Sequence, residues 1–348
     1  MDWQKPDPKL YHLPFHLSDF NGMPYRSLGA SGLKVPNIGL GTWKIGFPET
    51  GDGSRVNPEA AFAIFDRAIE LGVTFWDTAN RYNAASGNSE RIIGQWLSNN
   101  QDQRRNVIIA TKLFGGMDGR TPNHCGLSRG NILDSVHASL KRMQLEYIDL
   151  LYFHGYDLWT PIEESLAAIE DLVRQGYIRY FAVSNFTVDQ IKAYQAAAKH
   201  FSIRCHITAV QNQYDILFGE RNQAGVLERA VSSGFSFVPW SPIAKGLLSD
   251  RYLDSQKLKA GDRLYDENDL EAVHNPLIHK KLTQLAALAH DWNMELSQLA
   301  IAYMLTLPGM GPIIVSSSNV EQLESNAKAG KLQLNDQQQQ AVKQIISM

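Results

Sequence analysis

Four polar side chains stand at or just beyond the ends of three successive apolar segments. Asp77 closes the first segment and Tyr82 follows it five residues later, whereas Lys112 and His154 close the second and third. A buried ammonium beside a phenol favours the phenolate and so lowers the pKa of the phenol, and a carboxylate behind the lysine keeps the lysine protonated. We therefore expect Tyr82 to be an effective acid near neutral pH.

Such an acid delivers a proton to a carbonyl oxygen as negative charge grows there, while His154 donates a hydrogen bond to the same oxygen. None of these side chains is a hydride donor, so reduction of the carbonyl requires a nicotinamide cofactor. Each residue also has a purely structural interpretation. Asp77 and Lys112 alone suggest a buried ion pair, and a single histidine or tyrosine is more often packed in a core or loop. Their joint placement favours a catalytic site.

From residue 38 onward, short apolar segments alternate with longer segments of helical period. Strands rich in β-branched and aromatic residues on both faces, each followed by an amphipathic helix, indicate a parallel sheet covered by helices. Eight such units in 348 residues favour an α/β fold of the (β/α)8 TIM-barrel type over a doubly wound sheet. The predicted strands are 38–42, 73–77, 107–112, 148–154, 178–184, 207–211, 235–241 and 312–316. The predicted helices are 58–71, 89–98, 129–143, 161–174, 188–198, 224–232, 279–291, 296–306 and 320–329.

A barrel gathers the carboxyl ends of its strands at one rim, so Asp77, Lys112 and His154 are expected in a common bowl with Tyr82 leaning over it. The connection 242–275 is far longer than an ordinary βα loop, which favours a binding lid at that rim. Residues 1–24 are interpreted as an N-terminal extension, and 25–348 as one domain that begins with a β-hairpin around the turn 29–32.

Composition excludes several classes of function. The formal net charge is −3 and no basic cluster compensates for it, so nucleic acid is not an expected partner. No stretch approaches the ~20 apolar residues of a membrane span and no leader pattern opens the chain, so a cytoplasmic protein without membrane contact is expected. The two cysteines suit a reducing compartment, and His124 with Cys125 lacks further ligands, so no metal site is expected.

From residue 25 to about 330 the chain resembles the aldo-keto reductases. The matching segments are 33–43 (LKVPNIGLGTW), 77–79 (DTA) with Tyr82, 87–90 (GNSE), 109–112 (IATK), 183–186 (VSNF) and 240–242 (WSP). The resemblance implies an (α/β)8 barrel and a catalytic tetrad of Asp77, Tyr82, Lys112 and His154. It also implies an NAD(P)H-dependent reduction of an aldehyde or ketone to an alcohol by direct hydride transfer.

The resemblance further implies cofactor-binding positions. Those at the nicotinamide are Ser184, Asn185 and Gln211 for the carboxamide and Trp240 for stacking on the ring. Those nearer the phosphates and adenosine are Ser241, Ile243, Gly246, Ser318, Gln322 and Asn326. Cofactor contacts are also expected from Gly41, Thr42, Trp43, Asp77, Pro242 and Ser316. Taken without the family, Ser184 and Asn185 could merely end a strand and Trp240 could pack on the rim.

Two departures from the family pattern affect the contact with a 2′-phosphate. An arginine often found beside Ser318 is replaced by Asn319, and a glutamate that usually precedes the last asparagine is replaced by Ser325. Arg251 and Arg263, in the long connection, are expected to supply the missing charge. NADP (NADPH) is therefore the expected cofactor, with NAD as the alternative.

The substrate is expected to be a small carbonyl compound or a sugar. The residues expected around it are Trp43, Tyr82, His154, Tyr156 and Trp159, whose aromatic faces suit apolar aldehydes and sugar rings alike. Two alternatives remain open. One is oxidation of a sugar or polyol with NAD(P), with Tyr82 as base. The other is a cofactor-binding regulatory subunit, because the β subunits of voltage-gated potassium channels resemble this family. A homo-oligomer is also left open.

Overall fold

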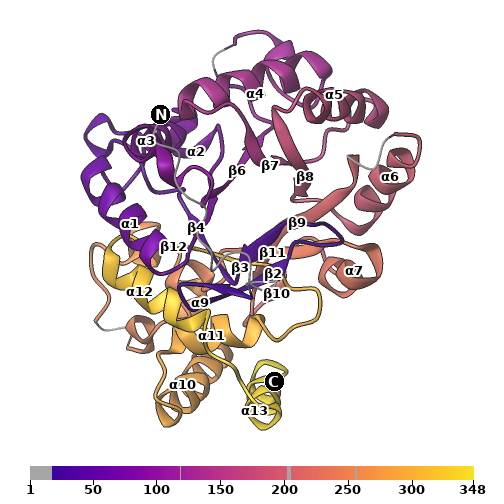
Figure 1. Ribbon diagram of the computed structural model, residues 1–348. Helices are drawn as coiled ribbons and strands as arrows, with labels where there is room; N and C mark the ends of the chain where they lie inside the picture. The colour runs from indigo at the N-terminus through magenta and orange to yellow at the C-terminus, as the bar shows by residue number, and fades with distance from the viewer. Residues whose placement is uncertain (1–17, 118, 202–204, 255–256) are drawn as a thin grey trace, which may run out of the picture.

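The computed structural model describes residues 18–117, 119–201, 205–254 and 257–348, and eight of its strands form a curled parallel sheet (Figure 1). The eight are β4 (Ile38–Gly41), β5 (Phe75–Asp77), β6 (Ile108–Leu113), β7 (Ile148–Phe153), β8 (Ile178–Ser184), β9 (Ile207–Asp215), β11 (Ser236–Trp240) and β12 (Ile313–Ser316). Their order is β11-β9-β8-β7-β6-β5-β4-β12. The barrel closes between β11 and β12. There the backbone of Phe237 forms hydrogen bonds with Gly309 and Gly311, just before β12. The predicted (β/α)8 barrel is confirmed.

Helices surround the strands on the outside of the barrel, as Figure 1 shows. The helices of this layer are α1 (Pro58–Glu70), α3 (Asn88–Asn99), α4 (Arg129–Met143), α5 (Ile162–Arg174), α6 (Val188–Ala198), α7 (Val226–Ser233), α10 (Pro276–Asp291), α11 (Leu296–Met304) and α12 (Val320–Ala329). Local sequence explains where several begin. Asn57 caps α1 ahead of Pro58, and Thr187 with Gln190 forms a capping box at α6.

Among the described residues, four further α-helices were not predicted: α2 (Tyr82–Ala85), α8 (Arg263–Asp266), α9 (Glu271–His274) and α13 (Asp336–Ile346). The last of these packs beside α10, where the Lys281 Nζ donates to the carbonyl oxygen of Ile346 at 2.7 Å. Val342 is its buried apolar contact. Helices α8 and α9 lie within the long connection 242–275, so this connection contains regular secondary structure.

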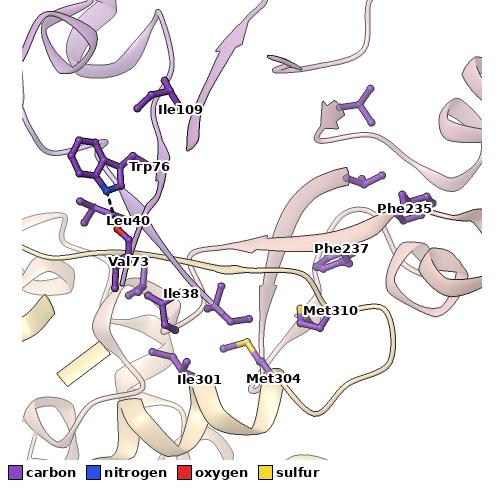
Figure 2. Packing of buried hydrophobic residues seen from close by; sticks show 14 of the residues in the cluster. Ile38, Leu40, Val73, Trp76, Ile109, Phe235, Phe237, Ile301, Met304 and Met310 are labelled. Atoms are coloured by element: carbon purple, nitrogen blue, oxygen red, sulfur yellow. Dashed lines mark hydrogen bonds between the residues drawn. The ribbon is translucent and has the colours of Figure 1, made fainter. Parts of the chain in front are cut away.

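The hydrophobic core has two layers. Between strands and helices, Trp76 stacks on Phe65 at 4.5 Å between ring centroids and meets Trp96 edge to face. Figure 2 shows Trp76 in this layer with its Nε1 bonded to the carbonyl oxygen of Val73, at 2.9 Å. The second layer fills the inside of the barrel with alternate strand residues, such as Phe75 next to Trp76. Period-two alternation thus directs Trp76 outward and its neighbours inward.

A small antiparallel sheet covers the amino end of the barrel. Its strands are β1 (Asp19–Phe20), β2 (Met23–Ser27) and β3 (Lys34–Pro36). The predicted hairpin is therefore present, and Leu28 and Val35 join the core inside the barrel. Gly29 has φ +57, and a Cβ there would lie 2.3 Å from the carbonyl oxygen of Thr208. The first 17 residues of the predicted extension, 1–24, lie outside the described residues, so its boundary stays a prediction, as does the single domain 25–348. The short strand β10 (Gly219–Glu220), paired with β9, was not predicted.

Candidate active site

Asp77 and Lys112 form a buried ion pair at the carboxyl ends of β5 and β6. Their side chains are 2% and 1% exposed, and the Lys112 Nζ lies 2.5 Å from the Asp77 Oδ2. The ammonium also donates to the carbonyl oxygen of Thr78 at 2.8 Å and to the Tyr82 Oη at 2.7 Å. Because these three acceptors match the three N–H groups of an ammonium, Lys112 is fully hydrogen-bonded.

Tyr82 is held over Lys112 by a strained turn. The next three residues, Asn83, Ala84 and Ala85, have φ of 56°, 56° and 61°. Left-handed backbone is costly outside glycine, and such strain is found where a structure must position a functional group. Asn83 fixes the turn by donating from its Nδ2 to the carbonyl oxygen of Ile45. The Tyr82 oxygen accepts from Lys112, so its own proton points either toward Asp77 Oδ2, 3.4 Å away, or into the cavity.

His154 completes the group directly after β7. Its backbone N–H donates to Leu113 at 2.9 Å, and its carbonyl oxygen accepts from the Asn185 Nδ2 at 2.8 Å. The imidazole meets the Tyr82 ring edge to face, with 6.0 Å between centroids. The structure thus brings together all four residues that the sequence singled out as a tetrad.

The ionisation of the site differs from the sequence-based expectation. Burial, aided by the Asp77 carboxylate, raises the pKa of Tyr82 well above its ordinary value. The expectation of a lowered pKa fails because burial, together with the Asp77 carboxylate, outweighs the effect of the Lys112 cation on the phenol. Burial also lowers the pKa of Lys112, although Asp77 opposes this shift. Burial and the nearby cations Lys112 and Arg81 lower the pKa of His154 to about 3.

These shifts define what the site can do. Because its pKa is raised, Tyr82 holds its proton at neutral pH and can give it to a strong base such as an alkoxide. His154 is neutral, so one ring nitrogen carries a proton to donate and the other does not. The arrangement suits protonation of an oxygen on which negative charge is forming.

A cavity of about 790 Å³ opens above these residues, within the size range of ligand pockets. Tyr82, His154 and Asp77 line it, together with the predicted cofactor positions Gly41, Trp43, Ser184, Asn185, Gln211, Trp240, Ser241, Pro242, Ile243, Gly246, Arg251, Arg263, Ser316, Ser318, Gln322 and Asn326. Thr42 is the exception among those positions. It is buried, and its Oγ1 donates to the carbonyl oxygen of Asp77 at 3.0 Å.

Three of the residues expected at the nicotinamide are engaged with the tetrad or with one another. The Gln211 Nε2 donates to the Asp77 Oδ1 at 2.8 Å, so Gln211 holds the second oxygen of that carboxylate. The Asn185 side-chain oxygen accepts from the Trp240 Nε1 at 3.2 Å, and its Nδ2 donates to the backbone carbonyl oxygen of His154. Asn185 therefore links the Trp240 indole to the backbone at His154.

The two arginines expected at a 2′-phosphate line the cavity but pair with carboxylates. Arg251 lies 3.1 Å from Asp262, and Arg263 lies 2.8 Å from Glu267. Arg263 also stacks over the Trp43 ring at 4.8 Å. The described part of the connection 242–275 thus borders the cavity and is braced by ion pairs.

Two residues expected around the substrate lie outside the cavity. Tyr156 is partly buried and packs edge to face against Phe186 and Tyr194 at the margin of the core. Trp159 is 92% exposed on the loop after β7. Trp43, Tyr82 and His154 do line the cavity, and Trp43 is 40% exposed. The predicted roles of Tyr156 and Trp159 are therefore not supported by their placement.

Several lining residues were missed. Lys44 and Arg55 come from the loop between β4 and α1, and Glu295 and Ser297 from the start of α11. The position of Lys44 next to Trp43 was the one sequence signal for the first pair. Glu295 gave none, because it is far along the chain from any strand end.

Among the helices described, none combines the length and apolar character required to cross a membrane. Within the same ranges, no group of three or more His, Cys, Asp or Glu side chains is arranged to hold a metal ion.

Comparison with known proteins agrees with the geometry. The sequence model of the Aldo/keto reductase family matches residues 37–347. A protein of Arabidopsis thaliana named "Probable voltage-gated potassium channel subunit beta" is 31% identical over 310 residues, which cover 88% of this chain and 91% of that protein. A protein of the same name from Oryza sativa subsp. japonica is 30% identical over 310 residues, with the same shares covered.

Proposed function

The chain belongs to the aldo/keto reductase family, and on that premise we propose that it is an oxidoreductase that reduces an aldehyde or ketone with NADPH. Tyr82 is the proton donor in this proposal. The observation that carries it is the contact of 2.7 Å between the Tyr82 Oη and the Lys112 Nζ at the wall of a cavity that His154 also lines.

The cavity lining suits a nicotinamide dinucleotide. Polar groups of Ser184 and Asn185 and the indole of Trp240 lie at the tetrad end. Gly41, which pairs with Asp77 in the sheet, also lines the cavity, and a Cβ there would approach the Ser316 Oγ to 2.9 Å. Lys245, Arg251 and Arg263 supply cations that suit phosphate groups.

The proposed reaction divides the work between cofactor and protein. Reduced nicotinamide, when bound, supplies a hydride to the carbonyl carbon. The carbonyl π electrons move to oxygen, where the neutral His154 donates a hydrogen bond and Tyr82 transfers its proton. The ammonium of Lys112 stabilises the resulting phenolate, which regains a proton from water. Lys112 therefore acts after Tyr82 ionises, and Asp77 with Gln211 holds Lys112 in place.

An isotope experiment tests this proposal directly. Purified protein is given NADPH deuterated at the transferable position and a panel of aldehydes, ketones and sugars, and the alcohol is analysed by mass spectrometry. We expect one deuterium on the former carbonyl carbon. Alcohol without deuterium would rule out direct transfer.

Dissociation constants for NADPH and NADH test the proposed cofactor preference. Arg251→Met should weaken the binding of NADPH about tenfold more than that of NADH.

A second candidate function rests on the names of the two plant relatives. Both are named as potassium channel β subunits, so a cofactor-binding regulatory subunit is the competing proposal. Tight NADPH binding without turnover of any carbonyl compound would favour it. The third alternative, oxidation of a sugar or polyol with Tyr82 as base, is separated by measuring both reaction directions with the same substrate pair.

A further inference from the structure

The cavity has a cationic wall that neither the tetrad nor the predicted cofactor positions account for. Lys44 and Arg55 line it from the loop between β4 and α1. Across the described ranges, Lys44 has no carboxylate within ion-pair distance. Its Nζ donates to the carbonyl oxygen of Gly53 at 3.1 Å and lies 4.3 Å from the centroid of the Trp43 ring. This ammonium therefore faces a ligand space with its charge unmatched.

Neighbouring cations add to the charge of this wall. Arg263 stacks over the same Trp43 ring, at 4.8 Å. Burial lowers the pKa of Lys44, and Arg263 and Arg55 lower it further, against the opposing effects of Glu267 and Asp52. Glu267 and Asp52 have other partners, since Glu267 pairs with Arg263 and Asp52 accepts from Asn88 at 2.8 Å. An anion placed here would relieve the repulsion among these cations.

The loop that carries Lys44 is hydrogen-bonded to itself and to the turn that follows Tyr82. The carbonyl oxygen of Lys44 accepts from the backbone N–H groups of Arg55 and Val56 at 2.8 and 2.9 Å. The next carbonyl, that of Ile45, accepts from Asn83, the residue directly after Tyr82. The backbone of Lys44 is therefore tied to the turn that carries the proton donor, which favours recognition of a substrate held beside Tyr82.

We propose that the carbonyl substrate carries an anionic group, a carboxylate or a phosphate, and that Lys44 binds this group with Arg55 beside it. The inference rests on the proposed function and specifies its substrate class. Arg55 contributes less than Lys44, because its guanidinium already lies 3.2 Å from Asp266. Trp43 contributes a ring face below the ammonium. One N–H of Lys44 donates to the carbonyl oxygen of Gly53, so two remain to bond to the ligand.

A matched pair of probes tests the proposal. The specificity ratio is kcat/KM for 4-carboxybenzaldehyde divided by kcat/KM for benzaldehyde, measured with NADPH. We expect this ratio to fall about tenfold in Lys44→Met, because a charge-assisted contact is lost while the packing on Trp43 is kept. Arg55→Met should lower it less. Lys192→Met, on the exposed face of α6, is the control and should leave the ratio unchanged.

The outcomes separate this proposal from the proposed function. An unchanged ratio in Lys44→Met overturns it, and so does a weaker NADPH affinity without a change in the ratio, which would assign Lys44 to a cofactor phosphate. If the wild-type protein reduces neither aldehyde, calorimetric titration of both aldehydes into the protein with NADP+ decides instead. Tighter binding of 4-carboxybenzaldehyde, lost in Lys44→Met, then supports the anion site. Equal binding of the two aldehydes refutes it.

Discussion

Replacing Lys112 with methionine would leave the Asp77 carboxylate buried without its cation. The two side chains are 1% and 2% exposed, so water cannot take the place of the ammonium. Removing one partner of a buried ion pair costs about 3–5 kcal/mol of stability. Because Gln211 still donates to the other carboxylate oxygen at 2.8 Å, we expect a loss near the lower end, about 3 kcal/mol.

The double variant Asp77→Leu/Lys112→Met separates the charge effect from the packing effect. It removes both charges, so its loss of stability should be smaller than that of Lys112→Met alone. Urea unfolding followed by tryptophan fluorescence measures both, with the midpoint and slope reported separately. A double variant that is less stable than the single one would show that packing, not charge, sets the loss.

A Lys112→Met protein within about 0.5 kcal/mol of wild type at neutral pH would contradict the reasoning from the buried ion pair.

Three further predictions concern the hydrophobic core, the hydrogen bond from Gln211 to Asp77 and the ionisation of His154. Trp76→Ala should cost about 3–5 kcal/mol because it empties the space beside Phe65 and Trp96, whereas Trp159→Ala, at a site 92% exposed, should stay within about 0.5 kcal/mol of wild type in the same urea experiment. Gln211→Leu leaves an oxygen of the Asp77 carboxylate without its donor and should cost about 1–3 kcal/mol, with Gln195→Leu on α6 as the comparison at a peripheral amide. His154 has a folded pKa of about 3, below its ordinary value, so it adds stability that is present above ~6.5 and is lost as the pH falls toward 3. His154→Gln should therefore lose less stability than wild type between pH ~7 and ~5, and equal losses would show that His154 is protonated in the folded protein.

The positions of the barrel strands could be predicted because each is a short apolar run that ends in polar residues. The prediction for β9 ended at Gln211, but the strand continues to Asp215 and turns back into β10. Apolar and polar residues hardly alternate over 212–215, so the sequence does not mark a strand there. Only the pairing with neighbouring strands makes these residues part of one. Helix α13 was missed because its glutamine-rich start has little apolar content. The signal that would have found it is the capping box of Asn335 and Gln338.

The composition of the tetrad was predictable, whereas its ionisation was not. Any barrel gathers the ends of its strands at one rim, which places Asp77, Lys112 and His154 together without knowledge of side-chain contacts. The direction of the Tyr82 pKa depends on burial and on how closely Asp77 balances Lys112, a separation of 2.5 Å that no sequence pattern encodes. The placement of loop residues is equally hard to predict from sequence. Trp159, for example, was expected at the substrate but does not line the cavity.

The most direct test of the account is the kinetics of Tyr82→Phe. This change removes the phenol oxygen that lies 2.7 Å from the Lys112 Nζ and leaves the ring beside His154. We predict that kcat/KM for aldehyde reduction falls by about 10²-fold or more, the usual contribution of a general acid, while the NADPH dissociation constant stays within about threefold of wild type. Reduction at close to the wild-type rate would show that the proton comes from another group.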